Sequence, residues 1–119
     1  MSSIRRIDSG ARMSEAVIYN GIARLAGQVA DDAAQGIEGQ TRQVLASIDA
    51  LLAKCGTSKA NLLSAQIYIA DMADFPRMNN VWEEWIKDAG KPARATVEAA
   101  LARPGWKVEI VVIAAVTNG

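Results

Sequence analysis

Residues 91–116 read KPARATVEAALARPGWKVEIVVIAAV, and this stretch determines the arrangement that we predict for the rest of the chain. It predicts two strands, separated by a connection that contains Pro104 and Gly105. The second strand, 107–116, is apolar at almost every position, and side chains along a strand alternate between its two faces. Both faces must therefore be covered, and Glu109 is the one carboxylate among them.

Glu109 needs a donor, because an ionised carboxylate buried without one is strongly destabilising. Arg94, at the head of the preceding strand, is the candidate partner. A guanidinium there suits a planar carboxylate ligand, which it binds through two parallel hydrogen bonds, and Glu109 would then orient or deprotonate a water. The alternative is a structural arginine–glutamate pair that fixes the register between strands or between subunits.

Composition narrows the possible chemistry. The 119 residues predict a single domain, 1–119, with 13 basic and 13 acidic residues and no net charge, which argues against a nucleic-acid partner. No histidine and one cysteine argue against a metal site, a disulfide and a histidine-activated nucleophile, so we expect no metal. No secretion signal or membrane span is recognisable, which predicts a cytoplasmic protein.

The first half of the chain predicts a short strand around 4–7, a hairpin and a helix. The hairpin joins 15–19 to 22–26 through Asn20-Gly21, the dipeptide that best fits a two-residue type I′ turn. From 36 to 55 apolar residues recur at helical spacing and Gly56 is a natural terminator. Cys55 closes this apolar stripe, so we interpret it as a small core residue.

The second half predicts a strand, 62–70, followed by a second helix. Leu63, Ala65, Ile67 and Ile69 are expected on one side of that strand. In the helix, Asp74 is the expected N-cap and Gly90 the expected end. Its apolar stripe consists of Met78, Val81, Trp82, Trp85 and Ile86.

This order of elements predicts an α+β fold, in which a mixed sheet carries two helices on one face. The other face would remain rich in Ala, Val and Ile and would exceed the apolar patch that a monomer usually tolerates. We therefore expect a closed homo-oligomer that buries it.

Other candidate site residues carry weaker signals. Gly27, in Ala26-Gly27-Gln28, ends a strand where a ligand can approach the backbone, although most such glycines only allow a turn. Asn79, near the start of the second helix, is kept as a substrate contact although it is expected to be solvated. The acidic pairs Asp31-Asp32 and Glu83-Glu84 are interpreted as solvated surface.

Several segments together resemble the RidA (YjgF) family over nearly the whole chain. They are AGQVA after the hairpin, IYIADMADFPRMNNVW, and PARATVEAALARPGWKVEIVVIAAV, with Pro92-Ala93-Arg94, Val97-Glu98 and Val108-Glu109-Ile110 as the most specific part. The resemblance implies a chorismate-mutase-like fold, a homotrimer with sites between subunits, and hydrolysis of reactive enamines and imines to 2-oxo acids and ammonia. It also implies that no metal or organic cofactor takes part. It thus implies an enzyme of metabolite damage control, with Arg94 binding the substrate carboxylate and Glu109 holding the attacking water.

The chain also departs from the family pattern. Ala26 stands where many deaminating members have serine, Thr96 where cysteine is frequent, and Met13 where a pocket tyrosine is common. These three residues are predicted to line the substrate site. Three functions follow: an imine deaminase, a non-catalytic trimer that binds small carboxylates or docks a partner, and an RNA-directed role, which the zero net charge disfavours.

Overall fold

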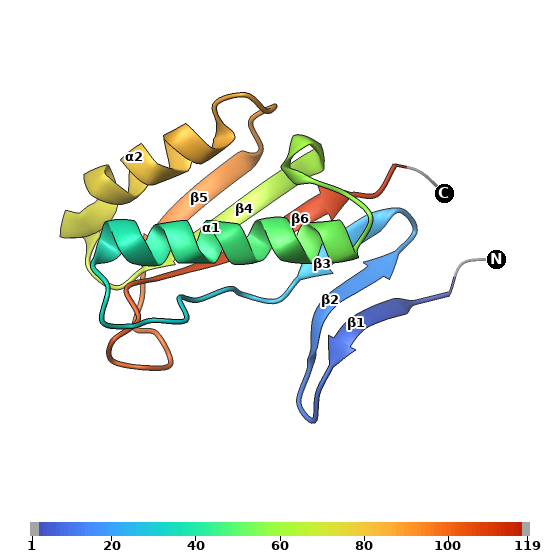
Figure 1. The fold of residues 1–119 in the computed structure, drawn as a ribbon, viewed down its shortest axis with the longest axis horizontal. Coiled ribbons are helices and arrows are strands. Elements are labelled where there is room, and N and C mark those ends of the chain that lie inside the picture. Colours follow the sequence, from blue (N-terminus) through green and yellow to red (C-terminus); the bar gives the residue numbers. More distant parts are fainter. Residues whose placement is uncertain (1–2, 118–119) are drawn as a thin grey trace.

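Six strands form one mixed sheet, and both α-helices lie on the same face of it (Figure 1). The computed structural model describes residues 3–117. The strands are β1 (Arg5–Ser9), β2 (Ser14–Tyr19), β3 (Ile22–Leu25), β4 (Leu62–Ile69), β5 (Ala93–Glu98) and β6 (Val108–Ala115). Across the sheet they follow the order β1-β2-β3-β6-β4-β5, with only β4 and β5 parallel. The predicted α+β class is confirmed.

The hairpin predicted from Asn20-Gly21 joins β2 to β3. Asn20 has a φ of 52° and Gly21 a φ of 73°, the positive values that a type I′ turn requires at both central residues. The turn lets Tyr19 pair directly with Ile22, which sets the register of the two strands.

Helix α1 (Ile37–Lys54) packs its apolar stripe on the sheet. Val44, Ile48 and Leu52 are fully buried, and the chain leaves the helix through Gly56 at a φ of 80°. Cys55 is 1% exposed, so the prediction of a core residue is confirmed, and burial raises the pKa of its thiol.

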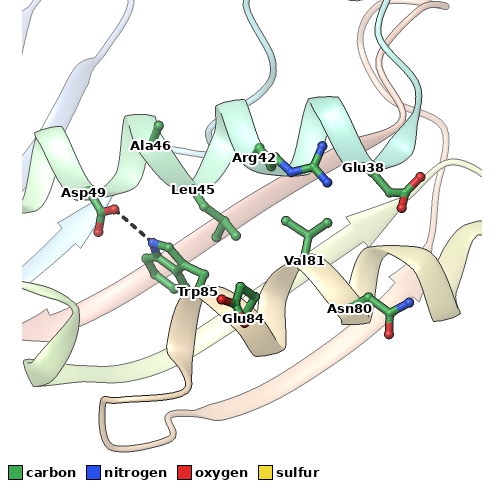
Figure 2. A pocket seen from close by; sticks show the side chains of 9 residues that line it. All are labelled: Glu38, Arg42, Leu45, Ala46, Asp49, Asn80, Val81, Glu84 and Trp85. Atoms are coloured by element: carbon green, nitrogen blue, oxygen red, sulfur yellow. Dashed lines mark hydrogen bonds between the residues drawn. The ribbon is translucent and has the colours of Figure 1, made fainter.

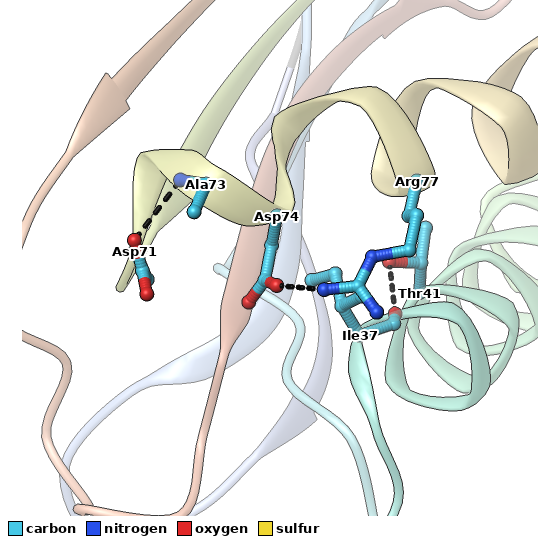
Figure 3. A network of polar contacts seen from close by, with 6 residues as sticks. All are labelled: Ile37, Thr41, Asp71, Ala73, Asp74 and Arg77. Atoms are coloured by element: carbon cyan, nitrogen blue, oxygen red, sulfur yellow. Dashed lines mark hydrogen bonds and ion pairs between the residues drawn. The ribbon is translucent and has the colours of Figure 1, made fainter.

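Helix α2 (Phe75–Ile86) starts where predicted but ends early. Asp74 holds the N-cap position, yet its carboxylate accepts a hydrogen bond from Arg77, while Asp71 caps the short turn before the helix (Figure 3). The prediction of Gly90 as the end is wrong. Lys91 Nζ donates to the carbonyls of Ile86, Lys87 and Ala89, so a side chain ends the helix before the glycine. Among the described residues, neither helix is long and apolar enough to cross a bilayer.

The sheet has a helix face and an open face. On β6, Val108, Ile110, Val112 and Ala114 lie under the helices and are fully buried, whereas the residues between them face the other way and are partly exposed. On β4, Ala65, Ile67 and Ile69 share the helix face. Leu63 does not, contrary to prediction: a register shift between Leu62 and Ser64 leaves its side chain 46% exposed.

Strand β5, at the edge of the sheet, presents its polar side chains to the helix face and its apolar side chains to the open face. Arg94 pairs with Ala65 and Thr96 with Ile67, so its polar residues share the helix face with buried neighbours on β4. Its apolar residues, Ala93, Ala95 and Val97, belong to the open face and are exposed. The apolar surface of the open face therefore extends to the edge of the sheet.

Gln40 connects α1 to two loops through four hydrogen bonds. Its Nε2 donates to the carbonyls of Ala33, Gln35 and Gly105, and its Oε1 accepts from the backbone N–H of Lys107. The side chain is completely buried. It therefore holds the segment before α1 against the start of β6.

We predict that Gln40→Ala lowers the free energy of unfolding by about 2–4 kcal/mol, because it removes a completely buried side chain together with its four part-buried hydrogen bonds. Urea unfolding measures the change. Gln43→Ala is the matched control on the same helix, since Gln43 makes one bond, to the exposed backbone of Asp32, and should cost less than about 1 kcal/mol. Equal losses in the two variants would contradict the role given to Gln40.

Candidate functional site

Arg94 lies between β5 and α2, with its guanidinium against aromatic rings. The Cζ atom is 5.4 Å from the centroid of the Trp82 ring and 5.8 Å from that of Phe75. Within residues 3–117 its side chain forms no hydrogen bond or ion pair. A half-buried cation thus retains N–H donors that a ligand can use.

Two buried oxygen atoms belong to the same layer as Arg94. Thr96 Oγ1 on β5 and Asn79 Oδ1 on α2 are both buried and have no hydrogen-bond partner in the described chain. Asn79 was expected to be solvated, and for this oxygen that expectation is wrong. Buried polar atoms are almost always paired, so these two oxygens, in the layer between sheet and helices that also holds Arg94, are candidate contacts for a ligand.

Glu109 lies on the open face, packed against Gly27. Gln28 pairs with Ile110 through two backbone hydrogen bonds of 2.9 and 3.1 Å, which place Gly27 beside Glu109. A Cβ at Gly27 would overlap Oε2 of Glu109 and lie 2.8 Å from its Cδ. The glycine therefore makes room for the carboxylate, which forms no hydrogen bond or ion pair within residues 3–117.

The segment that contains Gly27 is held in place on both sides. The backbone N–H of Ala26 donates to the carbonyl of Glu15, and Gln28 Nε2 donates to the Glu15 carboxylate and to the carbonyl of Ala26. Met13 is less constrained. It is 51% exposed at the turn between β1 and β2, where it lines a hollow with Arg12 and Glu15. The predicted role of Met13 in the substrate site therefore stays a prediction.

Arg94 and Glu109 do not pair within one chain. Strand β4 separates β5 from β6, and the two side chains project from opposite faces of the sheet. The interpretation of a pair that fixes the register between adjacent strands is therefore wrong. The described residues form two separate half-sites: the arginine half-site of Arg94, Thr96 and Asn79, and the glutamate half-site of Glu109, Gly27 and Ala26.

Three hollows of the described chain lie at or near the helices and the open face, and Arg94 lines two of them. One of about 380 Å³ lies between α1 and α2, where the Trp85 indole N–H donates to Asp49 at 2.9 Å (Figure 2). It contains none of the residues predicted from sequence to bind substrate. A second, of about 440 Å³, is lined by Trp82, Pro92 and Arg94 and adjoins the arginine half-site. A third, of about 320 Å³, lies over the apolar open face of β4, β5 and β6.

Sequence reasoning missed the two rings beside Arg94. Trp82 was assigned only to the apolar stripe of the helix, and Phe75 was not considered. A signal was available, because Phe75, Asn79 and Trp82 are spaced i, i+4, i+7 and so share one face of α2. The sequence alone does not show that Arg94 lies on the face of β5 that meets α2.

Comparison with known proteins shows which sequence family the chain matches. Residues 3–116 match the family model described as Endoribonuclease L-PSP. A RutC family protein of Haemophilus ducreyi is 50% identical over 97% of this chain and 98% of its own length, and the RutC family protein YoaB of Escherichia coli is 43% identical over 96% and 99%.

The fold is similar to solved structures of the same group. A YjgF family protein of Neisseria meningitidis superposes with a TM-score of 0.94 at 45% identity, covering 98% of both chains. Yeast Mmf1 superposes with a TM-score of 0.87 at 25% identity, covering 95% of this chain and 98% of its own. Sequence and fold agree along the whole described chain, which therefore belongs to the RidA (YjgF) family.

Proposed function

We propose that this protein hydrolyses 2-imino acids, and their enamine tautomers, to 2-oxo acids and ammonia. The observation that carries the proposal is the half-buried Arg94 guanidinium, which has no partner in the described chain and belongs to the same layer as the orphan oxygens of Thr96 and Asn79. Such a guanidinium suits a carboxylate ligand, and the family resemblance supplies the class of reaction.

The complete site is proposed to form between two copies of the chain. In one chain the half-sites lie on opposite faces of the sheet, so Arg94 of one copy can meet Glu109 only of another. The apolar open face, which extends through Val111, Ile113 and Ala95, gives a second copy a surface to cover. A homotrimer, the assembly that the resemblance implies, closes such contacts into a ring.

In the proposed reaction, Arg94 binds the carboxylate and draws electron density from the neighbouring imine carbon. Glu109 accepts a proton from water as its oxygen bonds to that carbon, which forms a carbinolamine. Glu109 gives that proton to the imine nitrogen, so the carbinolamine is neutral. It then carries the carbinolamine hydroxyl proton to the same nitrogen, and the C–N bond breaks to release ammonia as the C=O bond of the 2-oxo acid forms. The backbone N–H of Gly27 stabilises charge on the nitrogen side. Positioning supplies most of the rate gain, because these substrates also hydrolyse unaided.

Ammonia release tests the proposal. An amino-acid oxidase generates the imine in situ, and the protein should accelerate ammonia formation about a hundredfold over the spontaneous rate, which corresponds to about 3 kcal/mol. Rates equal to the spontaneous hydrolysis for small and bulky imines alike would refute the deaminase.

One feature favours a second candidate, a trimer that binds small carboxylates without turnover. Ala26, in the glutamate half-site, has no hydroxyl to help the leaving group, and Met13 is apolar and exposed. A thermal-shift screen with 2-oxo acids separates the two candidates, because binding without ammonia release supports the second. The formal charge of zero gives no reason to prefer RNA as the ligand.

A further inference from the structure

We propose that Phe75 and Trp82 are positioning residues, which clamp the Arg94 guanidinium between two aromatic faces and leave its N–H donors free for a carboxylate. This inference rests on the proposed function and extends it to residues that are not otherwise assigned to the site. Its structural basis is the pair of short distances from Cζ of Arg94 to the two ring centroids, 5.4 and 5.8 Å.

A carboxylate site needs a guanidinium that is fixed in place but whose N–H donors are not already bonded, and two aromatic rings meet both requirements. An arginine held by a protein carboxylate has its fork occupied, so a ligand must displace that partner. An aromatic face attracts the cation through the negative centre of its ring and uses none of the N–H groups. The acid on the same face of β5, Glu98, accepts from the backbone N–H of Met72 at 2.8 Å and so is already engaged.

The rings are rigid enough to fix the guanidinium. Trp82 is 6% exposed and belongs to the core, and its ring packs against that of Trp85 with centroids 5.4 Å apart and planes tilted by 52°. Phe75 packs on the same core at the start of α2. The hollow of about 440 Å³ beside Trp82 and Arg94 gives a small ligand access to the cation.

Fluorinated tryptophan tests the clamp, because fluorine withdraws electron density from the ring and adds little volume. All three tryptophans are replaced biosynthetically by analogues with one, two or three ring fluorines. With 2-oxobutyrate as the probe, Kd should rise stepwise with fluorine number, by about three- to tenfold across the series. KM for the imine should rise with it while kcat stays nearly constant.

Two controls separate the attraction between the Trp82 ring and the Arg94 cation from the effect of ring volume on packing. Trp82→Phe grown on the same analogues carries fluorine only at Trp85 and Trp106, so its Kd should not follow fluorine number. Methyltryptophan adds volume without withdrawing electrons and should leave Kd within twofold of the parent protein. A Kd indifferent to fluorine in the parent, or the same trend in both proteins, would overturn the clamp.

Nuclear magnetic resonance of the arginine side chains tests whether the rings hold Arg94 even if no 2-oxo acid binds. The Nε–H of Arg94, assigned by its loss in Arg94→Lys, should be shielded by the rings and as ordered as the backbone, unlike that of exposed Arg42. Trp82→Leu should mobilise it. A mobile, unshielded Arg94 in the parent protein refutes the clamp, whereas an ordered Arg94 in a protein that releases ammonia no faster than the spontaneous rate refutes the proposed function alone.

Discussion

Replacing Arg94 with alanine is expected to lower kcat/KM for 2-imino acids by about a hundredfold or more, since removing one partner of a desolvated charge pair costs about 2–5 kcal/mol. The fold should survive, because the guanidinium forms no hydrogen bond or ion pair within residues 3–117 and packs only against Trp82 and Phe75. The oxidase-coupled release of ammonia measures the loss, and thermal unfolding confirms that the variant is folded.

Two further variants sharpen this prediction. Arg94→Lys keeps the charge but loses the fork, so it should recover only part of the activity, mainly through a higher KM. Arg42→Ala removes an exposed guanidinium on α1 and should leave activity unchanged. If Arg94→Ala retained the parental rate, carboxylate binding by Arg94 would be disproved.

Adding one methyl group at Gly27 is expected to have a comparable effect. In Gly27→Ala the new Cβ would overlap the Glu109 carboxylate, so that side chain must leave the position in which it would hold water. The φ of Gly27 lies outside the left-handed region, so alanine introduces a steric clash without backbone strain. We expect kcat to fall about a hundredfold, as for loss of a general base, in single-turnover measurements of imine hydrolysis.

Gly90→Ala is the matched control, since a Cβ at Gly90 meets nothing within 4 Å. It should retain parental activity. Glu109→Gln should reproduce the loss seen in Gly27→Ala, because it removes the proton acceptor and keeps the shape of the side chain. An active Gly27→Ala protein together with an inactive Glu109→Gln protein would show that the carboxylate does not need its present position.

Local sequence signals predicted most of the fold. Asn20-Gly21 sets the hairpin because few residues tolerate positive φ at both positions, and the apolar stripe of 36–55 specifies α1 through its period alone. The apolar pattern on both faces of 107–116 correctly indicated a strand, which the structure places between β3 and β4. Each of these signals lies within one element and needs no knowledge of its neighbours.

The remaining features depend on contacts between elements. The alternation in β5 shows which residues share a face but not which face meets the helices, and Ala93, Ala95 and Val97 resemble a core side although they face away. Leu63 left its expected side through a bulge, which shifts alternation by one position. Lys91 ends α2 through hydrogen bonds to carbonyls two to five residues earlier, a local side-chain contact that a search for a terminating glycine does not detect.

In the candidate site, too, the residues could be chosen from the sequence, but their positions relative to one another could not. Arg94 and Glu109 could be selected from residue type and from the family resemblance, but strands consecutive in sequence need not be adjacent in the sheet. Insertion of β4 between β5 and β6 separates the two residues and turns an expected pair into two half-sites. Gly27 was recognised as a place of close approach, whereas its neighbour Glu109 became evident only from the pairing of Gln28 with Ile110.

The most direct measurement of a site shared by two copies mixes two inactive variants. Arg94→Ala and Glu109→Gln proteins are unfolded together and refolded in equal amounts, and ammonia release is then compared with each variant refolded alone. Random assembly places an intact Arg94 beside an intact Glu109 in about a quarter of the sites, so the mixture should recover about a quarter of the parental activity. A mixture no more active than the separate variants would contradict the shared site.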